Sequence, residues 1–188
     1  ACRTVLDLIF EHLTAWLAPI LCFTAEEAHL ARDASRKDSG DSVHLRDFPH
    51  VPEAWRDPAL AERWDKLRRL RRVVTGALEL ERAERRIGSS LQAAPTIHAD
   101  AATLAALQGI DLAEVAITSG VTLVAGAPPA GAFTLPDVAG IGVTPNLAEG
   151  EKCQRCWRVL PEVAAHPKKE LCHRCADAVA TQMQGGRA

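Results

Sequence analysis

With 188 residues, 47% of them hydrophobic, the chain can form one large or two small domains and is too apolar to be a disordered tail. Its net charge of −2 does not by itself predict a polyanionic partner. No run of about eighteen apolar residues and no basic-then-apolar leader is present, so we expect neither a membrane span nor a signal peptide. The chain opens with Ala-Cys-Arg directly in helical periodicity, and we therefore expect a fragment of a longer protein.

Positive charge is concentrated in two parts of the chain. Residues 62–86 carry nine basic and five acidic side chains, and residues 151–188 carry seven basic and four acidic ones. The segment between them, 87–150, has five acidic side chains and no lysine or arginine. Two basic regions separated in this way suggest contact with a nucleic acid without requiring it.

Residues 2–18 have the apolar period of a helix buried on one face, and Pro19 is expected to end it. The apolar positions are Val5, Leu6, Ile9, Leu13, Trp16 and Leu17. Thr24 and Glu27 have the spacing of a capping box, which predicts a second helix of about ten residues. A polar loop at 33–42 and an extended connection through Phe48 and Pro49 follow.

Asp57-Pro58 is typical of a helix start, and the periodicity predicts a long helix to about Arg85. Its expected buried positions are Leu60, Trp64, Leu67, Val74 and Leu78. Six basic side chains lie close together on it: Arg63, Lys66, Arg68, Arg69, Arg71 and Arg72. They form either a solvated face with ion pairs four residues apart or a face that contacts phosphates, since crowded arginines repel one another without a polyanion.

Residues 87–147 are predicted to form a small α+β unit. We expect a strand at Leu91–Ile97, a short helix at Asp100–Leu107, and a β-pair of Val115–Thr118 with Val121–Val124. Residues 133–135 and 140–144 are candidate edge strands. The unit contains no recognisable nucleophile motif, glycine-rich phosphate loop or histidine cluster.

Two C-x2-C pairs, Cys153 with Cys156 and Cys172 with Cys175, are fifteen residues apart. This spacing is typical of a four-cysteine zinc site, in which four thiolates fill the tetrahedron and leave no position for a catalytic water. A pair of disulfides or a redox motif are weaker alternatives, because redox C-x-x-C motifs occur singly. The other two cysteines, Cys2 and Cys22, are expected to be buried free thiols, which fits a reducing compartment.

Basic and aromatic side chains surround these four cysteines. We consider as RNA contacts Lys152, Arg155, Trp157, Arg158, Lys168, Lys169 and Arg174. Arg155 and Arg174 lie inside the C-x2-C turns and could instead stabilise the sulfur ligands. Trp157 could cover the metal core or stack on an unpaired base. His166 and His173 are minor candidates for substitute ligands.

Four stretches resemble the C-terminal region of bacterial isoleucyl-tRNA synthetases, and they occur in the order found in that family. Residues 17–27 (LAPILCFTAEE) are similar to a corner of the anticodon-binding helical bundle, and Ser42-Val-His-Leu with Phe48-Pro49 resembles the segment after it. Residues 86–93 (RIGSSLQA) resemble a family motif in which an acid stands in place of Gln92. Residues 149–157 and 171–175 are similar to its terminal zinc ribbon.

The resemblance implies an α+β fold in three parts: a partial anticodon-binding helical region with the long basic helix (1–86), a junction unit (87–147) and a zinc ribbon (148–188). It also implies an enzyme that attaches isoleucine to its tRNA using ATP. The ATP and Mg²⁺ sites would belong to a catalytic domain with His-x-Gly-His and Lys-Met-Ser-Lys-Ser motifs, which this sequence lacks. We therefore expect this chain to bind tRNA and one structural Zn²⁺ without catalysing. We also expect a cytoplasmic monomer that joins the synthetase's upstream domains.

Two other interpretations remain open. A similar ribbon occurs in DNA glycosylases of the formamidopyrimidine type, which need an N-terminal proline nucleophile and a helix-two-turn-helix before the ribbon. The helices of residues 1–86 do not have that pattern. A zinc module that serves only a structural or protein-interaction role is the third interpretation, and the basic helix argues mildly against it.

Overall fold

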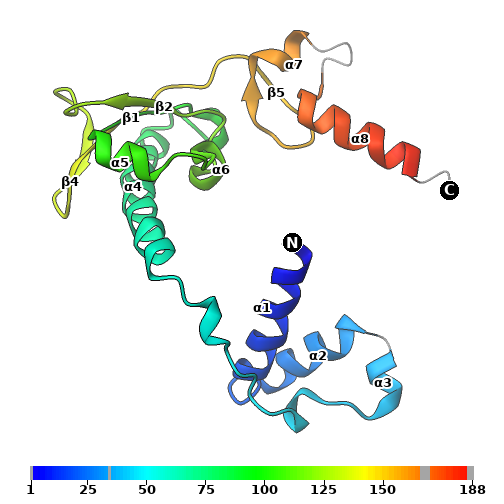
Figure 1. Ribbon diagram of the computed structural model, residues 1–188. Coiled ribbons are helices and arrows are strands. Elements are labelled where there is room, and N and C mark those ends of the chain that lie inside the picture. Colours follow the sequence, from blue (N-terminus) through cyan, green and yellow to red (C-terminus); the bar gives the residue numbers. More distant parts are fainter. Residues whose placement is uncertain (1, 34, 166–169, 186–188) are drawn as a thin grey trace. The chain divides into compact units, whose positions relative to one another are not determined.

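The computed structural model describes residues 2–33, 35–165 and 170–185 (Figure 1). The chain divides into two compact units, Ala1–Asp57 and Pro58–Ala188. Helices and small mixed sheets confirm the predicted α+β class. Among the described residues, no helix has the length and apolar character needed to cross a membrane.

The N-terminal unit consists of helices. Its α-helices are α1 (Cys2–Leu17), α2 (Cys22–Arg32) and α3 (Ser35–Ser39), followed by the 3₁₀ helices η1 (Val43–Leu45) and η2 (Glu53–Trp55). The end of α1 before Pro19 is as predicted. The capping box predicted at Thr24 is wrong, because α2 already begins at Cys22 and no side chain caps it.

The apolar stripe of α1 is largely exposed, which corrects the predicted burial of this helix. Its residues Val5, Leu6, Ile9, Leu13, Trp16 and Leu17 are 39–60% exposed. The buried apolar cluster of this unit is small and consists of Ala18, Ala25 and Val43. Cys2 and Cys22, which were expected to be buried, are also exposed.

Polar side chains join α2 to the segment that follows it. His29 is 1% exposed, and its two ring nitrogens lie 3.0 Å from Asp41 Oδ2 and 3.0 Å from the Arg36 guanidinium. Because a guanidinium can only donate, the Nδ1 atom of His29 accepts a hydrogen bond from Arg36, and the Nε2–H group donates one to the Asp41 carboxylate. The Glu26 carboxylate accepts from the Val43 N–H at 2.8 Å. These hydrogen bonds stabilise the N-terminal unit, whose buried apolar cluster is small.

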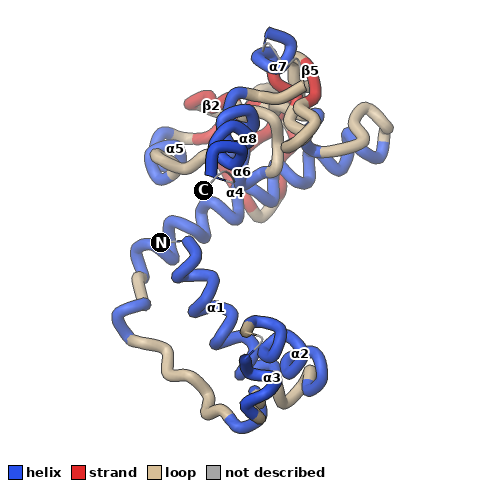
Figure 2. The backbone as a smooth tube through the Cα atoms, turned by 90° about the vertical axis from the view of Figure 1, so that its right-hand side faces the viewer, coloured by secondary structure: helices blue, strands red, loops and turns tan. Residues whose placement is uncertain are grey.

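In the C-terminal unit, the long helix α4 (Pro58–Ala83) packs on a four-stranded sheet (Figure 2). The strands β1 (Thr96–Ala99), β2 (Thr122–Ala125), β3 (Phe133–Leu135) and β4 (Val138–Thr144) have the spatial order β2-β1-β4-β3. β1 and β2 are parallel, and the other neighbouring pairs are antiparallel. The short helices α5 (Ala101–Ala106) and α6 (Leu112–Ala116) lie in the crossover between β1 and β2.

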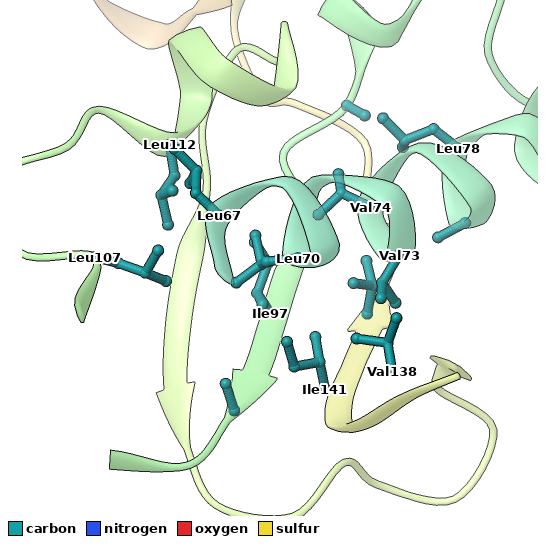
Figure 3. Close-up of a cluster of buried hydrophobic side chains, with 14 of the residues drawn as sticks. Leu67, Leu70, Val73, Val74, Leu78, Ile97, Leu107, Leu112, Val138 and Ile141 are labelled. Carbon is teal, nitrogen blue, oxygen red and sulfur yellow. The ribbon is translucent and has the colours of Figure 1, made fainter. Parts of the chain in front are cut away.

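One face of α4 supplies much of the core. Leu67, Leu70, Val73, Val74, Ala77 and Leu78 are buried, and Figure 3 shows several of them facing Ile97, Val138 and Ile141 of the sheet. Leu60 and Trp64, predicted to be buried, are 47% and 41% exposed. We predict that α4 belongs with the N-terminal helices in 1–86. In the structure the compact unit begins at Pro58, because α4 buries its apolar face on the sheet.

One predicted strand is wrong, and another is confirmed only in part. Residues 115–118 do not form a hairpin with 121–124, because Asp111 caps α6 by accepting from the Ala113 and Glu114 N–H groups, and β2 pairs in parallel with β1. The strand predicted at 91–97 is confirmed only from Thr96 onward, since the 3₁₀ helix η3 (Ser90–Gln92) precedes it. There Gln92 completes a capping box with Ser89.

The ribbon (residues 148–185 of the described chain) contains a two-stranded sheet and two helices. β5 (Glu151–Lys152) pairs antiparallel with β6 (Val159–Leu160), α7 (Pro161–Ala165) follows, and α8 (His173–Gly185) ends it. The sequence also predicts a short hairpin from Val159–Val163 through a turn at 166–169 to Leu171-Cys172, and α7 lies where part of its first strand is expected. The predicted turn at 166–169, including His166, Lys168 and Lys169, lies outside the described residues.

Replacing Leu70 by alanine tests the core. Leu70 is 1% exposed between α4 and the sheet, so Leu70→Ala is expected to lower the free energy of unfolding by about 2–5 kcal/mol. Leu80→Ala is the matched control on the same helix, because Leu80 is 51% exposed, and a change within about 0.5 kcal/mol is expected. Urea unfolding followed by circular dichroism measures both, and equal losses would contradict this packing.

Candidate metal centre and basic surface

The four cysteines of the ribbon form one cluster. Cys153, Cys156, Cys172 and Cys175 place their sulfur atoms within 4.8 Å of one another, and all except Cys156 are fully buried. The Cys156 and Cys172 sulfurs are 3.7 Å apart, too far for a disulfide bond of about 2.05 Å. Four sulfurs around Zn²⁺, each at about 2.3 Å, would be separated by about 3.8 Å. The donor set and its spacing therefore fit a closed tetrahedral zinc site.

The thiols of this cluster differ in how readily they ionise. Burial opposes ionisation of Cys153, but backbone N–H groups of Cys156, Cys172 and Arg155 outweigh it and lower its pKa to about 6. Burial raises the pKa of Cys172 to about 12 and also raises the pKa of Cys156. Because a metal binds thiolates, the backbone N–H groups around Cys153 favour the form of this ligand that a metal needs, whereas burial of Cys156 and Cys172 opposes it.

The backbone turn that presents Cys153 and Cys156 is tight. The Trp157 N–H donates to the Cys153 carbonyl at 2.8 Å, and Trp157 itself has the left-handed backbone angle φ +66°. Non-glycine residues rarely adopt this conformation, and it costs about 1 kcal/mol or more. Gly150 is required nearby, since a Cβ there would lie 2.3 Å from the Leu160 carbonyl carbon.

Trp157 is exposed. Its side chain is 58% exposed and does not belong to the buried cluster of the ribbon, so it does not cover the metal core. The Lys152 ammonium lies 5.5 Å from its ring centroid, within cation–π range.

Two arginines contact the thiol cluster, as one sequence interpretation allowed. The Arg155 guanidinium lies 3.8 Å from the Cys175 sulfur. Arg174 interacts with Cys156 and also forms a 2.7 Å ion pair with Glu114 of α6. Burial lowers the pKa of Arg174, but its interactions with Glu114 and Cys156 outweigh burial and raise the pKa above its usual value. His173 is not part of the four-residue metal cluster.

The basic side chains of α4 do not form one uniform group. Arg63 donates to the Ala106 carbonyl at 2.7 Å, and Arg71 donates to the Val115 carbonyl at 2.8 Å, near the ends of α5 and α6. These two side chains therefore tie the crossover helices to α4. Such hydrogen bonds to terminal helix carbonyls satisfy acceptors that the helices leave unpaired.

The remaining four, which we call the basic face, are Lys66, Arg68, Arg69 and Arg72. Lys66 and Arg68 make exposed ion pairs with Glu62 and Asp65 on α4, and Arg72 pairs with Asp137 at 2.9 Å. Exposed pairs of this kind contribute little and can exchange for other anions. Arg69 has no hydrogen bond or ion pair to any residue that the structure describes.

Residues outside the predicted site join the ribbon to the sheet unit. Arg158 donates to the Ser119 carbonyl at 2.7 Å, and the Val159 N–H donates to the Ser119 hydroxyl at 2.6 Å. Ser119 and Glu114 were not identified from the sequence. No local motif marks Ser119, because its partners are distant in the chain.

Arg63→Ala is expected to destabilise the C-terminal unit by about 1 kcal/mol, because it leaves the Ala106 carbonyl without its partner. Arg69→Ala is the control on the same helix, and its free energy of unfolding is expected to stay within about 0.5 kcal/mol of the wild-type value. Thermal or urea unfolding distinguishes them. Equal stability of the two variants would show that Arg63 is not a structural clamp.

Two known families match parts of the chain. The anticodon-binding domain of tRNA ligase matches residues 1–97, which is 97 of the 188 residues. The zinc finger found in FPG and IleRS matches residues 150–178, which include all four cysteines of the cluster.

Curated relatives match most of the chain. It is 52% identical to the isoleucine–tRNA ligase of Ruegeria pomeroyi over 93% of its length and 52% identical to that of Caulobacter vibrioides over 96%. The identity with the Agrobacterium fabrum isoleucine–tRNA ligase is 50% over 89% of the chain. The chain spans only 17–18% of the length of these relatives. On these matches, the chain belongs to the anticodon-binding domain family of tRNA ligases, and it ends in a structural zinc finger of the kind found in FPG and IleRS.

Proposed function

We propose that this chain is the tRNA-binding region of an isoleucine–tRNA ligase and holds the anticodon arm of the isoleucine tRNA. The observation that carries the proposal is the presence, in one chain, of an anticodon-binding match over residues 1–97 and a four-thiol cluster within the zinc-finger match. The parent enzyme would attach isoleucine to this tRNA using ATP, as a cytoplasmic monomer. ATP and Mg²⁺ would bind in a catalytic domain that is separate from this chain.

The chemistry of the residues supports a binding role over a catalytic one. The thiol cluster offers four soft donors, which leaves no open coordination position for a reacting water. The sequence contains neither of the two signature motifs of the catalytic domain. Binding of tRNA therefore accounts for the basic surface without requiring catalysis by this chain.

For the helix α4 we propose that the basic face, and not Arg63 or Arg71, contacts phosphates. Phosphate binding would break only weak, exposed ion pairs of Lys66, Arg68 and Arg72. It would break none of Arg69 within the described chain. A hollow of about 370 Å³ lies between α4 and α6, and it is lined by Trp64, Leu67, Arg68, Arg71 and Val115. An exposed aromatic ring beside a guanidinium suits a nucleotide, because the ring can stack and the cation can pair with phosphate.

For the ribbon we propose Trp157 as a stacking platform with Lys152 beside it, whereas Arg158 is held by the Ser119 carbonyl. Trp157 has a left-handed backbone conformation that a glycine would adopt without strain. Its exposed indole contributes little to the core, so we attribute the presence of tryptophan at this position to binding and not to stability. We assign Arg155 and Arg174 to stabilising the sulfur atoms that they contact, and not to binding RNA. Lys168 and Lys169 remain candidates from the sequence alone, since they lie outside the described residues.

We assign Cys153, Cys156, Cys172 and Cys175 as the ligands of one Zn²⁺. The bound ion would supply the folding free energy that the ribbon's small apolar cluster lacks, on the order of 10 kcal/mol. The residues themselves position the donors: backbone N–H groups stabilise the Cys153 thiolate, and Arg155 offsets negative charge at Cys175.

A glycosylase of the formamidopyrimidine type is the second candidate, since the zinc-finger description names that family too. The anticodon-binding match over residues 1–97 favours the synthetase. A purely structural zinc module would leave the basic face without a role.

Changing Arg68, Arg69 and Arg72 to glutamate is expected to weaken binding of isoleucine tRNA by about tenfold or more at ~0.1 M salt. Losing these phosphate contacts should also make the salt dependence of binding shallower. Filter binding or fluorescence anisotropy over a salt series measures both effects.

The matched control changes the same three arginines to lysine. It keeps the charge and should retain most of the affinity, because phosphate contacts of this kind are electrostatic. Unchanged affinity in the glutamate variant would leave α4 as an ordinary solvated face.

Cys172→Ser is expected to reduce zinc content well below one ion per chain and to unfold the ribbon, while the α4–sheet core stays folded. The reason is that the ribbon has its own small cluster, separate from that core. Cys22→Ser is the control, because Cys22 is an exposed cysteine outside the cluster and should keep one zinc. Metal analysis with amide exchange checks this, and full zinc occupancy in Cys172→Ser would refute the ligand assignment.

A further inference from the structure

Ser119 joins two parts of the C-terminal unit. It lies between α6 and β2 and is 2% exposed. On one side, its hydroxyl donates to the Leu91 carbonyl and its N–H donates to the Ala93 carbonyl at 3.0 Å. On the other side, its hydroxyl accepts from the Val159 N–H at 2.6 Å and its carbonyl accepts from Arg158 at 2.7 Å. One buried serine thus connects the segment before β1 to the ribbon.

The part of the ribbon that Ser119 holds is the part that carries the first metal ligand. The Cys153 N–H donates to the Arg158 carbonyl at 2.9 Å, and Lys152 pairs with Val159 in the β5–β6 ladder. The turn between these two strands contains Cys156. Any change in the coordination of Cys153 and Cys156 therefore acts directly on the two residues that contact Ser119.

Besides the contacts of Ser119, a hydrogen bond from the Ala148 N–H to the Gln92 carbonyl at 2.8 Å joins the start of the ribbon to the sheet unit. The hydrophobic cluster of the ribbon shares no residue with the core beneath α4. The Arg174–Glu114 ion pair is about 60% exposed on both sides and contributes little. A hollow of about 330 Å³, lined by Ser119, Leu147, Val159 and other residues, lies at the junction, so close packing does not seal it.

Arg158 is partly buried at this junction. Its Nε is buried and has no hydrogen-bond partner among the described residues, although its terminal nitrogen donates to Ser119. Burying part of a guanidinium without a partner is unfavourable, so the bond to Ser119 must compensate for it.

We propose that Ser119 is the positioning residue that docks the ribbon on the sheet unit, and that this docking is complete only when the four cysteines hold their metal. Without the ion, the turn from Cys153 to Arg158 is not fixed, and the Val159 N–H loses the alignment it needs. By linkage, undocking should in turn weaken metal binding by the same factor.

The test is amide hydrogen exchange at Val159 in the full chain, loaded with zinc or stripped by a chelator. In the loaded wild-type chain the Val159 amide is expected to be protected, and stripping should remove this protection. Loaded Ser119→Ala should exchange about five- to tenfold faster at Val159 while still binding one zinc at saturating metal. Ser119→Thr keeps the hydroxyl and should retain the protection.

Thr118→Val is the matched control. Thr118 is 1% exposed beside Ser119, but its hydroxyl donates only to the Gly120 carbonyl within the same turn. This variant should leave Val159 protected. The proposal is overturned if Ser119→Ala leaves Val159 protected, if Thr118→Val exposes it equally, or if the stripped wild-type chain stays protected. The measurement uses no RNA, so its failure is distinct from a failure of tRNA binding.

Discussion

Burial of one face of α4 against the sheet is the constraint on which the rest of the C-terminal unit depends. Six apolar residues of the helix are buried there, and this fixes which basic side chains point elsewhere. Arg63 and Arg71 are turned toward the crossover helices and hold their carbonyls. Lys66, Arg68, Arg69 and Arg72 are left with weak partners or none in the described chain. The six basic residues of α4 thus divide into two that stabilise the fold and four that are available to bind a polyanion.

The ribbon follows a different principle. Its apolar cluster consists largely of the cysteines themselves, with few further apolar residues, so metal coordination must replace hydrophobic burial as the source of order. The thiol with the lowered pKa, Cys153, lies next to the strand that contacts Ser119. Metal binding, the strained exposed Trp157 and docking on the sheet unit are therefore connected through a few residues of backbone. This arrangement explains how a small segment can hold an aromatic ring and cations in fixed positions.

Local patterns in the sequence predicted what depends on local geometry. The C-x2-C spacing correctly predicted one cluster of four thiols, and helical periodicity correctly predicted α1 and α4. Features that depend on distant partners were missed. The pattern predicts a hairpin of 115–118 with 121–124, whereas β2 pairs in parallel with β1. The exposure of α1 cannot be deduced from its apolar period. Ser119 was missed because its hydroxyl partners are 28 and 40 residues away.

The central claim is that this chain holds the anticodon arm of a tRNA by means of α4 and a metal-ordered ribbon. Nuclease footprinting of isoleucine tRNA, with the zinc-loaded chain added at increasing concentration, tests it most directly. The account predicts protection of the anticodon stem and loop that weakens when the metal is removed. Uniform cleavage at every concentration, or protection confined to the acceptor arm, would contradict it.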